Sequence, residues 1–276
     1  MESIFNEEAH DAEILALAFN GPYLASGSRD RLVHIFKYTA QGFVLQSTFN
    51  GHSGSVTSLC FTQKGDLLTT ATDKSIIHLK FQKDGSFVRL RQTQVTNTIF
   101  DMKMDLDDRI LTGGQDKKMN VLDLKNGKVL RSIQKSVTAS TTGDDVLKLQ
   151  LDPSGLFLAS SCQDKSLRLF HLQSGEMVSR VAGHSDTITA IRFSADCKQL
   201  ITSSSDGCIF VWTIPMEWQK LMQNKKHLTQ RRQSLWMPAI EVSTDEDFPT
   251  SPTYTAIGRA RTKPETKRLS SITNNL

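Results

Sequence analysis

The sequence predicts an all-β protein built as a β-propeller, because one polar pattern returns at a nearly constant spacing. Aspartates that we expect in tight turns are separated by 43, 43, 48 and 42 residues: Asp30, Asp73, Asp116, Asp164 and Asp206. Six positions after each aspartate stands an apolar or aromatic residue: Phe36, Leu79, Leu122, Phe170 and Trp212. Steps of about 40–45 residues are typical of propeller blades. We therefore expect five blades.

Residues 183–212 show the blade pattern most fully. The segment opens with Gly183-His184, continues through stretches of alternating apolar residues, turns at Asp206 and ends at Trp212. Alternation with a period of two indicates β-strands. A buried carboxylate or imidazole persists only when its hydrogen-bonding capacity is satisfied. The polar residues of the segment should therefore bond to one another.

The repeats also predict the domain boundaries. We expect a propeller over residues 1–214, with blades at about 7–50, 51–94, 95–135, 144–182 and 183–214. The 48-residue step indicates an exposed loop at 136–144, which is rich in Ser, Thr and Gly. An open ring would leave sheet edges exposed. The chain is therefore either a small closed ring, with residues 2–6 adding an outer strand to the last blade, or part of a larger propeller.

The strand pattern ends after Trp212. Pro215 and Glu217 suit the first turn of a helix, which we expect over residues 215–233. Its apolar stripe should dock on the propeller: Trp218, Leu221, Met222 and Leu228. Residues 234–276 are rich in Ser, Thr, Pro and charge, which predicts a disordered basic tail.

Charge and composition narrow the classes of function. Residues 1–215 include 23 basic and 23 acidic residues, whereas residues 216–276 include 10 basic and 6 acidic residues. A neutral propeller with a basic tail does not indicate a nucleic-acid reader. There is no apolar run of membrane-spanning length, and the acidic N-terminal residues do not resemble a signal peptide. We expect a cytoplasmic protein, not secreted, with reduced thiols at its four cysteines: Cys60, Cys162, Cys197 and Cys208.

No pattern in the sequence indicates catalysis. Gly113-Gly114 lacks the Lys-Ser/Thr of a phosphate-binding loop, and the histidines lack metal-binding spacing. The acidic residues 105–108 lack the later Glu of a Ca²⁺ loop, so they indicate a solvated turn. Ser, His and Asp occur together without an oxyanion hole. We expect no catalytic residue, metal, cofactor or small-molecule substrate, and no enzyme.

The blade residues resemble those of the WD-repeat family. The resemblance is carried by Gly183-His184, Ser204, Asp206 and Trp212. In that family the His, Ser, Asp and Trp of one blade hydrogen-bond to each other. The resemblance assigns this structural network to His184, Ser204, Asp206 and Trp212, and to their counterparts in the other blades: His10, Ser28, Asp30, His52, Asp73, Asp116 and Asp164.

Four segments are similar to a narrower scaffold family, which includes mitogen-activated protein kinase-binding protein 1 and its microcephaly-associated WD-repeat relative: 9–15, 28–34, 152–157 and 183–212. The similarity covers about residues 7–233 and implies the last five blades of a second propeller. It implies a non-enzymatic scaffold whose partners are stress-activated kinases and spindle-pole or microtubule-associated proteins, located at the spindle pole or centrosome. Candidate contact residues lie in the turns: Arg29, Lys74, Lys117 and Lys165.

An alternative function is that of a substrate receptor for a cullin-type ubiquitin ligase. Such receptors usually carry a Trp-Asp-x-Arg pattern in the third strand of a blade. The corresponding stretches here begin at Phe170 and Trp212 and contain no arginine. The pattern therefore favours the scaffold.

The tail carries short regulatory patterns. Ser234 follows two arginines, as basophilic kinases prefer, and Ser251 precedes a proline, as proline-directed kinases require. Phosphorylation would add about −1.5 to −2 charge. A further pattern resembles a kinase-docking peptide: Arg231, Arg232, Leu235 and Met237. The alternative interpretation is a solubilising tail.

Overall fold

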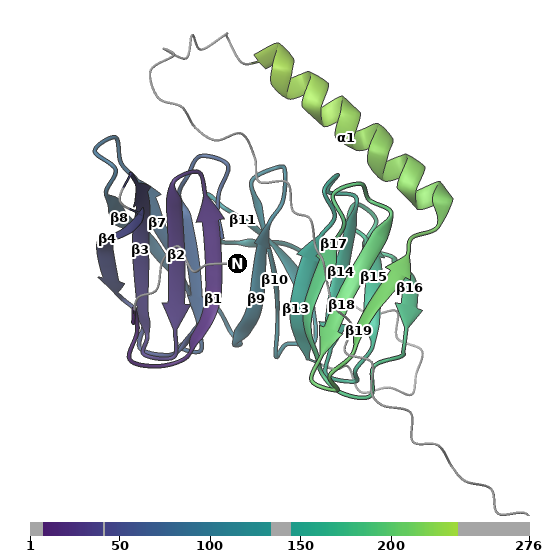
Figure 1. Ribbon diagram of the computed structural model, residues 1–276, viewed down its shortest axis with the longest axis horizontal. Coiled ribbons are helices and arrows are strands. Elements are labelled where there is room, and N and C mark those ends of the chain that lie inside the picture. Colours follow the sequence, from purple (N-terminus) through teal and green to yellow (C-terminus); the bar gives the residue numbers. More distant parts are fainter. Residues whose placement is uncertain (1–7, 41, 134–144, 237–276) are drawn as a thin grey trace, which may run out of the picture. The chain divides into compact units, whose positions relative to one another are not determined.

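The computed structural model describes residues 8–40, 42–133 and 145–236, and it places the strands in five antiparallel sheets (Figure 1). Each sheet is one blade, with its strands in chain order. Blade one consists of β1 (Ile14–Asn20), β2 (Tyr23–Ser28), β3 (Leu32–Thr39) and β4 (Gly42–Asn50). Blade two consists of β5 (Val56–Phe61), β6 (Leu67–Ala71), β7 (Ser75–Phe81) and β8 (Phe87–Gln94).

The remaining blades repeat this order. Blade three consists of β9 (Ile99–Met104), β10 (Arg109–Gly114), β11 (Met119–Asp123) and β12 (Val129–Ile133). Blade four consists of β13 (Val146–Leu151), β14 (Phe157–Cys162), β15 (Leu167–His171) and β16 (Met177–Val181). Blade five has three strands in the described part of the chain: β17 (Ile188–Phe193), β18 (Gln199–Ser204) and β19 (Ile209–Thr213). The predicted five-bladed propeller is confirmed.

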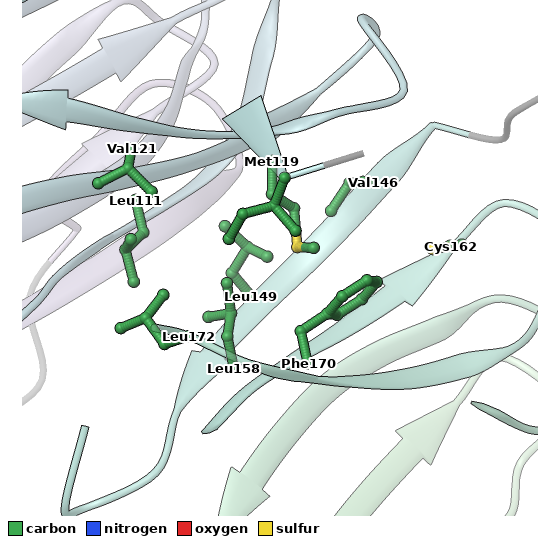
Figure 2. Close-up of a cluster of buried hydrophobic side chains, with 10 residues drawn as sticks. Leu111, Met119, Val121, Val146, Leu149, Leu158, Cys162, Phe170 and Leu172 are labelled. Carbon is green, nitrogen blue, oxygen red and sulfur yellow. The ribbon is translucent and has the colours of Figure 1, made fainter. Parts of the chain in front are cut away.

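The core lies between the blades. The second strand of each of the first four blades is largely buried, and in β14 every residue is buried. Figure 2 shows the junction of blades three and four, where Leu111 and Met119 face Val146, Leu149 and Phe170. Three further clusters repeat this arrangement at the other junctions. Because each blade buries its face on the next, the repeats stabilise one another.

Small residues allow neighbouring blades to approach closely. A Cβ atom added at Gly27 would lie 2.5 Å from Val56 Cγ1, and one at Gly113 would lie 2.6 Å from Val146 Cγ1. Both glycines belong to the second strand of a blade, and both valines begin the first strand of the next. Glycine is therefore required by space at these two positions rather than by backbone conformation.

Helix α1 (Met216–Trp236) follows the last blade and packs against its own domain. Met222 is buried, and the Trp218 ring contacts that of Phe157 in a tilted arrangement with ring centroids 5.6 Å apart, whereas Leu221 and Leu228 are exposed. The Lys225 and Lys226 ammonium groups donate to backbone carbonyls in the β13–β14 and β17–β18 turns. The helix extends three residues beyond its predicted end, so residues 234–236 are helical.

Several predicted features lie outside the described residues. They are the closing strand at 2–6, the loop at 136–144, and the tail from residue 237 onward. Among the cysteines, Cys162 and Cys197 are buried, Cys60 is half-buried and Cys208 is exposed, and none of the four forms a disulfide bond.

Candidate interaction surface

A hydrogen-bond network of four side chains connects the strands of blade five. His184 Nδ1 lies 3.0 Å from Asp206 Oδ2, and His184 Nε2 lies 2.8 Å from Thr202 Oγ1. The Trp212 indole N–H donates to the same hydroxyl at 3.0 Å. All groups are satisfied when His184 Nδ1–H donates to the carboxylate and the Thr202 hydroxyl donates to Nε2. The network extends from the blade entrance through Thr202 on β18 to Trp212 on β19.

The serine assigned to this network by resemblance lies elsewhere. Ser204 Oγ donates to the Asp186 carbonyl at 3.0 Å and accepts from the Asp206 backbone N–H at 3.3 Å. In blade one, Ser28 makes the equivalent bonds to Ala12 and Asp30. The structure thus corrects the assignment: a hydroxyl two residues earlier in the strand contacts the imidazole.

Blades one and two repeat the arrangement without a tryptophan. His10 bridges Asp30 Oδ2 and Ser26 Oγ, each at 2.8 Å. His52 lies 3.1 Å from Asp73 Oδ2 and 2.7 Å from Thr69 Oγ1. Both imidazoles are inaccessible to solvent. Each turn is therefore fixed to the blade entrance through one carboxylate.

The turn aspartates of blades three and four have different partners. Asp116 accepts from the Asn120 amide, while Asp164 pairs with the buried Arg168 and with Arg180. Ser166 Oγ also donates to Asp164 at 2.6 Å. In both blades the partner stands four residues after the aspartate, on the third strand. In both blades the carboxylate is thus held by a side chain of the third strand.

We expect the stability of blade two to fall at acid pH. Burial opposes ionisation of Asp73, but donors from Ser75, Ser53 and His52 outweigh it and lower the pKa of the carboxyl below 3.8. Burial also lowers the pKa of His52 below 6.5, against the opposing effect of Asp73. For both groups the unfolded chain binds the proton more readily, so the free energy of unfolding decreases as the pH falls.

The decrease should begin below pH 6.5 through His52 and continue below pH 3.8 through Asp73. Urea unfolding of the parent and of His52→Gln at several pH values measures it. The variant should be less stable at neutral pH and show a shallower slope between pH 7 and 5. Equal slopes for the two proteins would contradict the assignment.

Cationic side chains project from the turns that these networks hold. Four of them, which we name the turn cations, are exposed and adopt positive φ angles of 60–75° at the same position of their blades: Arg31, Lys74, Lys117 and Lys165. Blade five has Gly207 at this position. Arg29, also predicted as a contact residue, is exposed and pairs with Glu13 at 2.9 Å. This end of the described blades therefore presents a series of positive charges.

Sequence reasoning missed the groups that join one blade to the next. Asp101 is buried and accepts hydrogen bonds from Ser58 of blade two, Lys103 of its own blade and the Leu149 backbone of blade four. Arg91 donates to backbone carbonyls of Leu124 and Lys125 in the adjacent blade. Arg131 occupies the same position in blade three and donates likewise to the Leu172 and Gln173 carbonyls of blade four, so the arginine is repeated in two blades. The other blades carry different residues at the position of Asp101, so the repeat contains no signal for that contact.

The described residues contain no group of three or more His, Cys, Asp or Glu placed to hold a metal ion. Within the same part of the chain, no helix has the length and apolar character needed to cross a membrane. The proposed tail sites are not described as side chains: Arg231, Arg232, Ser234 and Leu235 fall in the last part of α1, and Met237 and Ser251 lie outside the described residues.

The repeat geometry agrees with the match to a family model. The model described as "WD domain, G-beta repeat" matches residues 1–37, 43–80, 131–171 and 175–213. The chain belongs to the WD-repeat family. The match leaves out residues 81–130, which include most of blade three, where Asn97 replaces the histidine of the blade entrance. This fold commonly mediates protein–protein interactions, and the chain is consistent with such a role.

Curated relatives support the narrower resemblance. WD repeat-containing protein 62 of Sus scrofa is 37% identical over 243 residues, which is 83% of this chain and 15% of that protein. Mitogen-activated protein kinase-binding protein 1 of Homo sapiens is 35% identical over 247 residues, or 84% of this chain and 16% of that protein. Cilia- and flagella-associated protein 52 of Homo sapiens is 25% identical over 214 residues, which is 75% of this chain and 33% of that protein. The chain thus spans about one sixth of the more similar relatives.

Proposed function

We propose that this protein is a non-enzymatic scaffold that binds a mitogen-activated kinase of the stress-activated type through the turn cations. Two observations support the proposal: one group of relatives is named for kinase binding, and the turn cations occupy a strained backbone conformation. Resemblance to the same family supports a cytoplasmic location at the spindle pole or centrosome. We place the binding surface at the turn cations because their backbone is strained.

A positive φ angle is costly for any residue with a Cβ atom, by roughly 1–2 kcal/mol. Gly207 adopts the same positive φ angle in blade five without that cost, because glycine has no Cβ atom. Blade five thus forms this turn without a side chain, yet four blades carry a long cation there. One of them, Lys165, also donates to the Ser185 carbonyl of blade five at 2.6 Å. Strain of this kind is concentrated at functional sites. A series of exposed cations favours a partner segment that is acidic, because opposite charges steer association.

Replacing turn cations with glycine distinguishes an effect on kinase binding from an effect on folding. In the triple variant Lys74→Gly, Lys117→Gly and Lys165→Gly, three charges are lost and three strained residues are relieved. We expect its binding to a purified stress-activated kinase to weaken about tenfold at low salt, because each exposed charge contributes up to about 1 kcal/mol. Its thermal unfolding temperature should equal or exceed that of the parent. Titration calorimetry at two salt concentrations, together with thermal unfolding, measures both.

A matched control removes the same charge from the other end of the blades. Lys64, Lys83 and Lys198 are exposed and lie in the first or third turns of their blades. Their triple replacement by serine should leave kinase binding within twofold of the parent. Equal affinity of both triple variants would show that the turn cations do not bind the kinase. Failure of the parent to bind would instead reject the kinase as partner.

A further inference from the structure

Blade three has the two groups that hold an imidazole in other blades, but no histidine at its entrance. In blades one, two and five the imidazole lies between the turn carboxylate and a hydroxyl of the second strand, at distances of 2.7–3.1 Å. The entrance of blade three, residues 95–98, is one residue shorter than that of blade two, residues 51–55. Asp116 and Thr112 nevertheless correspond to Asp73 and Thr69 of blade two.

These two groups are less well hydrogen-bonded than their counterparts. In blade five the turn carboxylate accepts from the imidazole and from two backbone N–H groups, at 2.8–3.0 Å. Among the described residues, Asp116 accepts from the Asn120 amide and, at 3.4 Å, from the Lys118 N–H. The Thr112 hydroxyl lies 3.5 Å from the Asn120 carbonyl oxygen, beyond the ~3.0 Å limit of a good O–H···O bond. Both groups therefore retain hydrogen-bonding capacity.

A cavity of about 170 Å³ lies beside them, and we name it the blade-three cavity. Its lining includes Asp116, Asn120, the buried Thr112 and Leu122, and the exposed Thr96, so it can be reached from solvent. Apolar walls with a few polar groups are typical of sites that bind small ligands or single side chains.

The residue four positions after the turn aspartate explains the size of the cavity. In blade four this residue is Arg168, whose long guanidinium-bearing side chain pairs with the turn carboxylate. In blade three it is Asn120, whose shorter amide also donates to the carboxylate. The Asn120 side-chain oxygen accepts from Ser132 Oγ at 2.6 Å, which holds the amide in place. The amide is smaller than a guanidinium or an imidazole ring, so it leaves room beside Asp116 and Thr112.

We propose that the blade-three cavity binds the imidazole ring of a histidine presented by a partner protein. One ring nitrogen donates to Asp116 and the other accepts from Thr112, as we assign for His184 in blade five. An imidazole is the occupant because the same pair of groups holds one in three other blades. None of the seven histidines in residues 1–276 lines the cavity, so the ring comes from elsewhere.

Titration of the isotope-labelled protein with imidazole at pH 8, followed by NMR, tests the site. This pH lies above the ordinary imidazole pKa of about 6.5, so the ring can donate from one nitrogen and accept at the other. We expect the amide signals of Gly113 and Gly114, which line the cavity, to shift with a dissociation constant on the order of millimolar. Thr112→Val and Asp116→Asn should each raise this constant at least about threefold, because each weakens one hydrogen bond.

Two further variants are controls for the titration. Asp84 also bonds the backbone N–H two residues later, but it does not line the cavity, so Asp84→Asn should bind imidazole like the parent. His184→Gly removes the ring from blade five and should gain a second imidazole site, which shows that the probe detects such cavities. The titration contains no kinase, so this proposal and that for the turn cations can fail separately.

A capped histidine, acetyl-histidine methylamide, distinguishes a protein side chain from a free small molecule. It should bind at least as tightly as imidazole and depend on Thr112 and Asp116 in the same way. A cavity that holds water alone would leave the Gly113 and Gly114 signals unmoved, and this result would overturn the proposal. Binding of imidazole without binding of the capped histidine would overturn the assignment to a protein partner. Equal binding of guanidinium would overturn the assignment to an imidazole.

Discussion

Replacing Gly114 with alanine should destabilise the protein by about 3 kcal/mol, the upper part of the range for an overpacked core. An added Cβ atom would lie 2.0 Å from the Thr98 carbonyl oxygen and 3.0 Å from its carbon. Both atoms belong to the backbone that enters β9, and the Gln115 N–H donates to the same oxygen at 3.1 Å. The contact cannot be relieved by a rotamer change, so β9 and β10 must separate. Urea unfolding measures the loss.

The neighbouring residue provides the control for this prediction. Gln115 is exposed, so Gln115→Ala should change the free energy of unfolding by no more than about 0.5 kcal/mol. Gly114 does not have a positive φ angle, so any large effect at this position arises from space rather than from backbone conformation. A Gly114→Ala variant with the urea midpoint of the parent would show that the strands are not in contact as described.

The blade order was predictable because its signals are local. A turn aspartate bonds the backbone N–H two residues later, as Asp30 does with Leu32 and Asp206 with Cys208. Such turns depend on a few consecutive residues, so they recur visibly in the sequence even where the rest of the blade has changed. Blade three illustrates this, since its aspartate remains although Asn97 has replaced the entrance histidine.

The network hydroxyl was not predictable from the same pattern. Residues two apart on a strand face the same side, so Thr202 and Ser204 are equivalent by periodicity. Only the register of β18 against β17 and β19 decides which one meets the imidazole. Asp101 poses a different problem, because its partners lie more than 40 residues away on two other blades. A single sequence carries no information on such contacts.

Replacing Thr202 with valine should lower the free energy of unfolding by about 1–3 kcal/mol, the cost of leaving buried polar groups unpaired. The valine keeps the shape of the side chain but removes the hydroxyl that lies 2.8 Å from His184 Nε2 and 3.0 Å from the Trp212 indole nitrogen. Thr202 is fully buried, so water cannot replace the hydroxyl without moving the strands. Urea unfolding at neutral pH measures the effect.

A double-mutant cycle shows whether the hydroxyl acts through the network. Trp212→Phe removes the indole donor but keeps an aromatic ring, as Phe36 does at the same position of blade one. In that background Thr202→Val strands only the imidazole nitrogen, so it should cost less than in the parent, with a coupling of at least about 0.5 kcal/mol. Ser204→Ala should cost the same in both backgrounds, because Ser204 bonds the backbone of Asp186 and Asp206 instead. Additive effects of Thr202→Val and Trp212→Phe would mean that the two groups do not share a hydrogen bond.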